Sequence, residues 1–275
     1  MAGLLYVCAT PIGNLGDASP RLAETLAAVD VVYAEDTRRS AALLTALGVS
    51  ASLRSFFVGN QHRRIADVEA DLAAGRSVAV ITDGGTPSVS DPGVVAVTAA
   101  RRAGAEVVVI PGPSAVTAAV AGSGMVDGPF VFEGFLPRKG GDRTRVLHSI
   151  AADTRPTVLF VSPHRARDDM VDLAGACGED REACVARELT KVHEELWWGT
   201  LREARDRWQD QGPRGEVTVV VAGAAPQVPD PEEARRLARE LVDSGMSKSE
   251  AAREAAAATG VTKRLIYDDL IKESD

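Results

Sequence analysis

The chain has 275 residues, of which 45% are hydrophobic and 25% charged, a composition typical of a globular protein of about two domains. This composition excludes a disordered chain, a collagen-like repeat and a membrane bundle. With 31 Lys and Arg against 39 Asp and Glu, the formal net charge is −8, so any nucleic-acid partner must bind a local basic patch or be a large structured assembly. The three cysteines form no C-x-x-C pair, and no signal peptide or membrane span is evident, so we expect a cytoplasmic protein without membrane contact.

In the first half of the chain, short apolar runs alternate with helical patterns. Strands are predicted at Leu4–Cys8, Val31–Ala34, Ser77–Ile81 and Val107–Ile110. Helices are predicted to follow the cap Ser19-Pro20 and to cover Arg64–Ala74 and Val94–Ala103. Because the strands are nearly continuous apolar runs, they indicate a parallel sheet covered by helices on both faces.

After Pro129 the connections between strands become shorter, which predicts a second α/β domain with some antiparallel pairing. Its strands are predicted at Phe130–Phe135, Thr157–Val161, Cys184–Arg187, Glu194–Trp198 and Val217–Val221. Beyond a proline-rich stretch, three short helices are predicted at Glu232–Asp243, Lys248–Ala258 and Lys263–Ile271. The expected organisation is an N-terminal α/β domain (1–120), a second α/β domain (121–224), a linker (225–231) and a small helix-turn-helix-like domain (232–275).

Three loops rich in Gly and Pro each follow a predicted strand directly. They are Thr10–Asp17, Thr82–Gly93 and Pro111–Ala115. Loops at the carboxyl ends of strands line the ligand crevice of an open α/β sheet, and glycine lets the backbone approach a ligand closely. Any one of these loops alone is better explained as a tight turn, but the three together favour a ligand-binding wall. A Walker A pattern and a dinucleotide fingerprint are both missing, which disfavours enzymes that use nucleoside triphosphates or nicotinamide.

A series of motifs runs in order from the first strand to about residue 223. The motifs are Thr10-Pro-Ile-Gly-Asn-Leu-Gly-Asp17, Ala34-Glu-Asp-Thr-Arg38, Asp83-Gly-Gly-Thr-Pro87, Ser90-Asp-Pro-Gly93, Pro111-Gly-Pro-Ser-Ala115, Phe132-Glu-Gly-Phe-Leu-Pro-Arg-Lys139, Ser162-Pro-His-Arg165, Ala186-Arg-Glu-Leu-Thr-Lys191 and Gly199-Thr-Leu201. Together they closely resemble the ribosomal RNA small subunit methyltransferase I family, a branch of the tetrapyrrole methylase-like superfamily. The chain departs from the family at Arg39, where His is usual, at Gly84, where Ala is usual, and at Val161, where Glu is usual.

The resemblance implies two α/β domains of the tetrapyrrole methylase type with S-adenosylmethionine in the cleft between them, no metal, and a homodimer. By motif position, the cofactor would contact Ile12, Gly84, Gly85, Thr86, Val89, Ser114, Ala115, Val161 and Leu189. The implied reaction is methylation of a ribose 2′-hydroxyl on a cytidine in the decoding region of 16S ribosomal RNA. The implied partner is therefore 16S rRNA or the small ribosomal subunit.

Because a 2′-hydroxyl is a weak nucleophile, a nearby base or cation would assist the transfer. The candidate catalytic residues are Asp36 with its neighbour Glu35, Glu133, Glu188 and Lys191. The alternative is that the acidic residues cap helices or pair with arginines. The candidate RNA-binding residues are Arg138, Lys139 and Arg143 around a Gly-rich loop, and Arg38; for these the alternative is a solvated surface.

Two other functions remain open from the sequence. A methyltransferase acting on a tetrapyrrole precursor would keep the cofactor loops but would need neither the basic loop nor the helical tail. A nucleic-acid-binding regulator would use the helix-turn-helix and treat the α/β body as a cofactor sensor, but the net negative charge argues against tight binding to duplex DNA.

Overall fold

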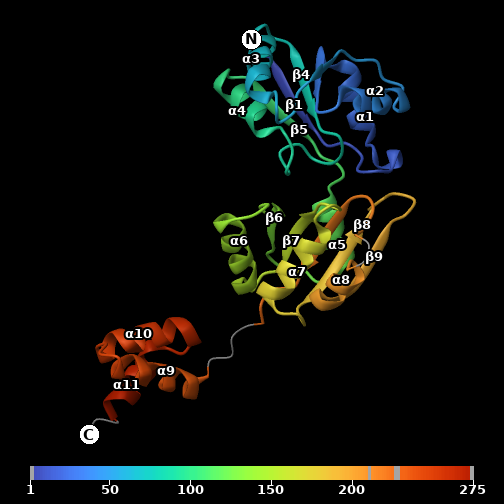
Figure 1. Ribbon diagram of the computed structural model, residues 1–275. Helices are drawn as coiled ribbons and strands as arrows, with labels where there is room; N and C mark the ends of the chain where they lie inside the picture. Colours follow the sequence, from blue (N-terminus) through green and yellow to red (C-terminus); the bar gives the residue numbers. More distant parts are fainter. Residues whose placement is uncertain (1–2, 210–211, 226–229, 273–275) are drawn as a thin grey trace. The chain divides into compact units, whose positions relative to one another are not determined.

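The computed structural model describes residues 3–209, 212–225 and 230–272. The chain forms two compact units, Met1–Ala224 and Ala225–Asp275 (Figure 1). The first unit contains two five-stranded sheets, and the second unit contains three helices. Most of the predicted linker, residues 226–229, lies outside the described residues.

The first sheet is entirely parallel, as its apolar strands predict. Its strand order is β3-β2-β4-β1-β5, and the strands are β1 (Leu4–Cys8), β2 (Val31–Ala34), β3 (Leu53–Ser55), β4 (Ser77–Ile81) and β5 (Glu106–Ile110). One face is covered by α3 (Gln61–Ala73) and α4 (Val94–Arg102), and the other by α1 (Pro20–Ala28) and α2 (Thr37–Ala46) (Figure 1). The Ser19 side chain caps α1 by accepting a hydrogen bond from the Leu22 backbone N–H, as predicted.

The second sheet is mixed, which confirms that part of this half is antiparallel. Its order is β6-β7-β10-β8-β9, where only β6 and β7 pair in parallel. The strands are β6 (Val131–Phe135), β7 (Thr157–Val161), β8 (Glu182–Arg187), β9 (Glu195–Thr200) and β10 (Val217–Val221). One face packs on α6 (Gly141–Ala152), α7 (Ala166–Cys177) and α8 (Leu201–Arg207), and the other on α5 (Ala115–Ser123), which connects the two sheets.

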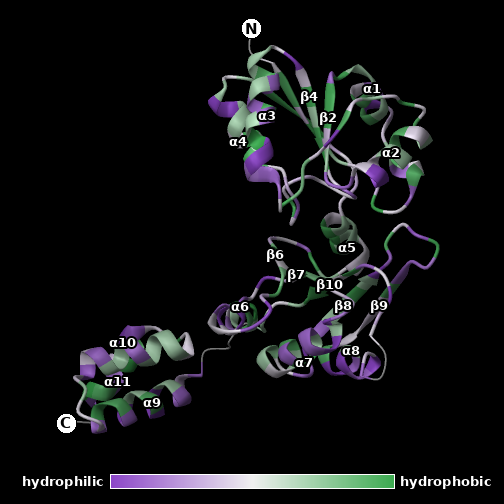
Figure 2. Ribbon diagram, turned by 45° about the horizontal axis from the view of Figure 1, so that its top comes forward, coloured by the Kyte–Doolittle hydropathy of each residue, from purple (hydrophilic) through white to green (hydrophobic). Residues whose placement is uncertain are grey.

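Hydrophobic residues concentrate in the strands, while the outer faces of the helices are largely polar (Figure 2). The core is built mainly from Val, Leu, Ile and Ala, in line with an aromatic content of only 4%. Among its few large aromatics, Tyr33 and Phe56 are completely buried and pack edge to face.

The second unit is a bundle of α9 (Pro231–Asp243), α10 (Lys248–Thr259) and α11 (Lys263–Lys272) around a small core of Ala, Val, Ile and Leu side chains. Ser247 caps α10, and Gly260 ends it in the left-handed conformation. In the described ranges, no helix is long and apolar enough to cross a membrane.

Candidate active site

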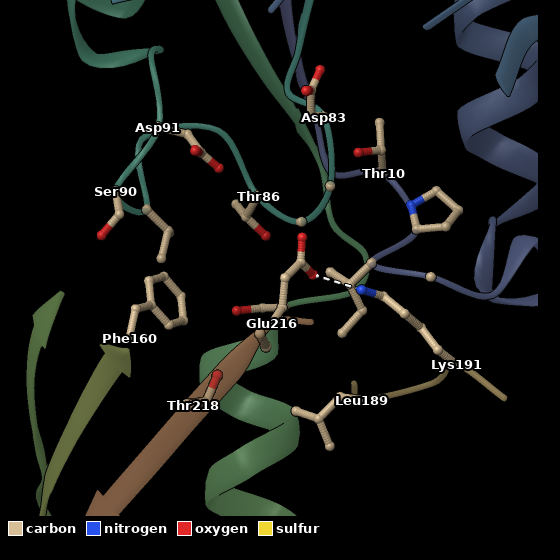
Figure 3. Close-up of a pocket in the computed structure, with 18 of the residues that line it drawn as sticks. Thr10, Asp83, Thr86, Ser90, Asp91, Phe160, Leu189, Lys191, Glu216 and Thr218 are labelled. Carbon is tan, nitrogen blue, oxygen red and sulfur yellow. Dashed lines mark hydrogen bonds and ion pairs between the residues drawn. The ribbon is translucent and has the colours of Figure 1, made fainter. Parts of the chain in front are cut away.

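A cavity of about 660 Å³ lies at the carboxyl ends of the strands of the first sheet. The segments that follow β1, β2, β4 and β5 line one side of it. The other side is lined by residues at the ends of β6, β7 and β10 and by the segment between β8 and β9 (Figure 3). This is the place where the topology of an open parallel sheet leaves room for a ligand.

All nine residues expected to contact the cofactor line this one cavity, although they come from five separate segments. Backbone hydrogen bonds hold the first two loops together, because Thr10 and Gly85 exchange N–H···O bonds of 2.9 and 3.0 Å. The Thr86 hydroxyl donates to the Pro113 carbonyl at 3.3 Å, which joins the third loop to them. Gly85 has a φ of +91°, a conformation that disfavours any residue with a side chain. These contacts fix the backbone of the three loops that line this side of the cavity.

The cavity carries more negative than positive charge. Its lining includes the carboxylates of Glu35, Asp83, Asp91 and Glu216, against the cations of Arg39 and Lys191. Arg39 donates to Asp83 at 3.0 Å, so this pair is neutralised internally. The remaining charge favours a cationic ligand.

Asp91 is the carboxylate most affected by this environment. Burial, together with the charges of Glu35, Asp83 and Glu216, raises the pKa of Asp91 to about 7. Its side chain forms no hydrogen bond or ion pair with the part of the chain that the structure describes. It projects beside Ser90 and above Phe160 (Figure 3). An unpartnered, partly buried carboxylate in a cavity is a site for a hydrogen-bond donor or cation of a ligand.

Lys191 lies on the opposite side of the cavity from Asp91 (Figure 3). Its ammonium contacts Glu188 at 2.7 Å and Glu216 at 3.1 Å. Burial lowers the pKa of Lys191, but the hydrogen bonds to these two carboxylates outweigh that effect and raise it overall. Lys191 is therefore a fixed cation at neutral pH rather than a proton acceptor. Its side chain crosses Gly13 so closely that a Cβ there would lie 2.4 Å from the lysine Cγ.

Of the other predicted catalytic residues, Asp36, Glu133 and Glu188 lie outside the cavity lining. Asp36 caps α2 by accepting from the backbone N–H groups of Arg38 and Arg39, as the alternative to catalysis anticipated. Glu188 forms an ion pair with the Lys191 ammonium. The pKa of Glu188 is lowered, mainly by its hydrogen bond to that lysine. Glu133 lies in β6 at a β-bulge and is not among the lining residues. Glu35 does line the cavity, and burial raises its pKa.

The predicted RNA-binding residues separate into two groups. Arg138, Lys139 and Arg38 are exposed. Arg143 is only 7% exposed, and its guanidinium contacts Asp169 at 2.9 Å and Asp172 at 2.7 Å. Because both edges of this guanidinium are already paired, Arg143 is a structural residue, and the prediction that it contacts RNA does not fit its position.

Asp91, Phe135 and Glu216 line the cavity but were not among the predicted site residues. Asp91 stands inside the motif Ser90-Asp-Pro-Gly93, and this was a signal that could have marked it. Phe135 likewise stands inside the motif Phe132–Lys139 and lines the cavity. Glu216 precedes β10 without any motif, so only the fold brings it beside Lys191. Within the described ranges, no group of three or more His, Cys, Asp or Glu side chains is placed to hold a metal ion.

Comparison with known proteins agrees with the fold. Residues 4–205 match the family of Tetrapyrrole (Corrin/Porphyrin) Methylases, and residues 228–272 match the RsmI C-terminal HTH domain. Among solved structures, the methyltransferase CobJ has a TM-score of 0.63 at 20% identity, covering 82% of this chain and 95% of its own. Uroporphyrin-III-C-methyltransferase from Thermus thermophilus has a TM-score of 0.58 at 18% identity, covering 80% and 94%. The fold is thus that of a tetrapyrrole methylase.

Curated relatives narrow the family further. A ribosomal RNA small subunit methyltransferase I from Synechocystis is 41% identical over 96% of both chains. The proteins of that name from Mycobacterium tuberculosis and Thermotoga maritima are each 43% identical, the former over 98% of this chain and 95% of its own, the latter over 80% and 99%. The chain belongs to the ribosomal RNA small subunit methyltransferase I family and is a methyltransferase.

Proposed function

We propose that this enzyme transfers the methyl group of S-adenosylmethionine to the 2′-hydroxyl of a cytidine in the decoding region of 16S ribosomal RNA, in the small ribosomal subunit. The observation that carries the proposal is the convergence of all nine expected cofactor residues on one cavity of excess negative charge. The relatives' name supplies the rRNA substrate class. The tetrapyrrole enzymes share only the fold at 18–20% identity, so they do not favour a porphyrin-type acceptor.

The residues present fit this cofactor. Its sulfonium and ammonium groups are cations, which match the unpartnered Asp91 and the excess carboxylates. Its adenine suits the apolar side chains of Ile12, Ala115 and Leu189, which belong to one hydrophobic cluster. At Gly84 a Cβ would lie 3.3 Å from the Pro11 carbonyl oxygen, so the first two loops pack closely at this point. When bound, the cofactor supplies an activated methyl group.

The protein's own contribution is mainly positioning and electrostatics. We assign to Lys191 the stabilisation of negative charge that develops on the 2′-oxygen, because its ammonium is held in the cavity by Glu188 and Glu216. Glu35 replaces its neighbour Asp36 as the preferred proton acceptor, because it lines the cavity and has a raised pKa. Glu35→Gln should lower kcat and leave the cofactor Kd within about twofold.

Arg138 and Lys139 are proposed to bind RNA phosphate. The helices α10 and α11 are proposed to add contacts with the same RNA. Arg38 is a weaker candidate for a phosphate contact, because its guanidinium also approaches Asp36 at 3.5 Å. Removing one cation that neutralises a phosphate should reduce the slope of log binding constant against log salt by about 0.7 to 0.9. The double variant Arg138→Ala/Lys139→Ala should therefore flatten the salt dependence of subunit binding. An unchanged slope would remove this patch from the proposal. The homodimer and the cytoplasmic location remain predictions.

The experiment that tests the function is transfer of a labelled methyl group to small ribosomal subunits from cells lacking this protein. The label is then mapped by nuclease digestion and nucleoside analysis. Label on a single cytidine ribose is the expected result. Label on a base would contradict the proposal. An unlabelled subunit would also contradict it if calorimetry shows that the cofactor binds, and this second outcome would favour a small-molecule acceptor.

A further inference from the structure

Phe135 is an exposed aromatic residue of the cavity lining. Its side chain lines the cavity, yet the residue is 54% exposed. A single exposed phenylalanine is ordinary on a protein surface and by itself indicates nothing. The neighbouring structure, however, fixes the place of this ring.

A β-bulge in β6 turns the Phe135 ring toward the cavity. In a regular strand, residues 132 and 135 point to opposite faces, because side chains alternate. The pairing of β6 with β7 shifts between Phe132 and Gly134, and Gly134 has a φ of +67°. As a result, both Phe132 and Phe135 contact Phe160, with ring centroids 5.0 and 5.5 Å apart. Bulges of this kind are frequent next to active sites, where they re-aim a side chain.

Two arginines hold the backbone immediately after Phe135. Arg165 donates to the carbonyls of Leu136 at 3.1 Å and Pro137 at 3.2 Å, and Arg143 donates to the Pro137 carbonyl at 2.9 Å. Both arginines also contact the buried Asp169. The ring is thus exposed but mounted on a rigid segment, which is the arrangement expected of a preorganised binding surface.

We propose that Phe135 is a stacking platform for the pyrimidine base of the RNA nucleotide that is methylated. The proposal rests on the function proposed above and adds the contact that holds the target nucleotide. A base that stacks at the mouth of the cavity places its ribose beside the cofactor, and the exposed Arg138 and Lys139 follow only three and four residues later, where they can meet flanking phosphates. Unpaired RNA bases are commonly held on aromatic rings in this way.

The competing occupant of the platform is the adenine of the cofactor. The inner part of the cavity, with Ile12, Ala115 and Leu189, offers adenine an apolar environment that is more buried than Phe135. A base delivered from the outside is therefore the better match for a ring that is more than half exposed. The two occupants are distinguished by whether subunit binding or cofactor binding depends on the ring.

The test compares Phe135→Ala, Phe135→Leu and Phe135→Tyr with the wild type. Steady-state transfer at varied subunit concentration gives KM and kcat, and calorimetry gives the cofactor Kd. Phe135→Ala and Phe135→Leu should each raise the subunit KM about tenfold or more, the size found when a base-stacking aromatic is removed. Phe135→Tyr should restore it, and the cofactor Kd should stay within about twofold throughout. The leucine variant keeps apolar packing on Phe160, so a rise in KM that it shares with the alanine variant is not explained by misfolding.

Phe130→Ala is the matched control. Phe130 is 37% exposed, lies just before β6 and does not line the cavity, so its removal should leave KM unchanged. Phe135→Leu with the wild-type KM would overturn the stacking platform, and so would a loss that appears entirely in the cofactor Kd. A wild-type enzyme that labels no subunit would instead overturn the proposed function, so the two failures are distinguishable.

Discussion

The raised pKa of Asp91 leads to a specific prediction about cofactor binding and pH. The carboxylate is held near a pKa of about 7 by burial and by Glu35, Asp83 and Glu216, against an ordinary value of 3.8. A bound cation stabilises the charged form and lowers this pKa, so binding releases a proton wherever Asp91 is protonated in the free enzyme. Affinity for S-adenosylmethionine should therefore increase as pH rises toward 7 and level off above it.

The magnitude follows from the fraction of Asp91 that is ionised before binding. With a pKa of about 7, roughly three quarters is ionised at pH 7.5 and about 3% at pH 5.5. The Kd should thus be about 25-fold larger at pH 5.5 than at pH 7.5, provided that the bound-state pKa is below 5.

Isothermal titration calorimetry between pH 5.5 and 7.5, in buffers of different ionisation enthalpy, measures both the Kd and the protons released. Asp91→Asn should bind the cofactor weakly and with little dependence on pH. Asp127→Asn removes a carboxylate outside the cavity and should keep the wild-type profile. If Asp91→Asn retains the full pH dependence, or the wild type shows none, the reasoning about this carboxylate is refuted.

Three further changes test the structural roles assigned above. Arg143→Ala should lower the unfolding free energy by about 3 kcal/mol, since it breaks a buried ion pair, and thermal denaturation measures this loss. Gly85→Ala should weaken cofactor binding in calorimetry more than Gly104→Ala, which has the same left-handed backbone but open space around it. Lys191→Met should lower kcat in the transfer assay while cofactor Kd stays within about twofold, and an equal loss in both would contradict its proposed role.

The strands were predictable because their signal is local. β1, β2, β4, β7 and β10 have the bounds that their apolar runs predict. The helix α1 begins after its predicted cap Ser19, and α10 begins at the predicted Lys248. The short edge strand β3 and the helices α2 and α5 to α8 were not predicted. β3 has three half-buried residues, and α5 is apolar on all sides, so neither shows the periodicity on which the prediction depends.

The site was only partly predictable, for a related reason. Motifs mark residues that lie together in the sequence, and the three loops after β1, β4 and β5 were found in that way. Pairings between distant segments leave no such mark. In the sequence, Arg143 is one of several basic residues near a Gly-rich loop, but the packing of α6 on α7 brings it against Asp169 and buries both. The charge of a side chain was visible in the sequence, whereas its partner was not.

The burial of Arg143 changes the role that we assign to the loop carrying Arg138 and Lys139. Arg143 and Arg165 each use their guanidinium to hold backbone carbonyls and a buried carboxylate at the same time, so they stiffen the segment that carries Phe135 and the two exposed cations. Phosphate contacts made by Arg138 and Lys139 alone would fix the position of an RNA strand but not which base enters the cavity. In the proposed arrangement, Phe135 lies on the same rigid segment as those cations. It therefore links the position of the RNA strand to the choice of the base that enters the cavity. In this proposed arrangement, the bulge at Gly134 is the feature that brings the proposed RNA-binding loop to the cavity.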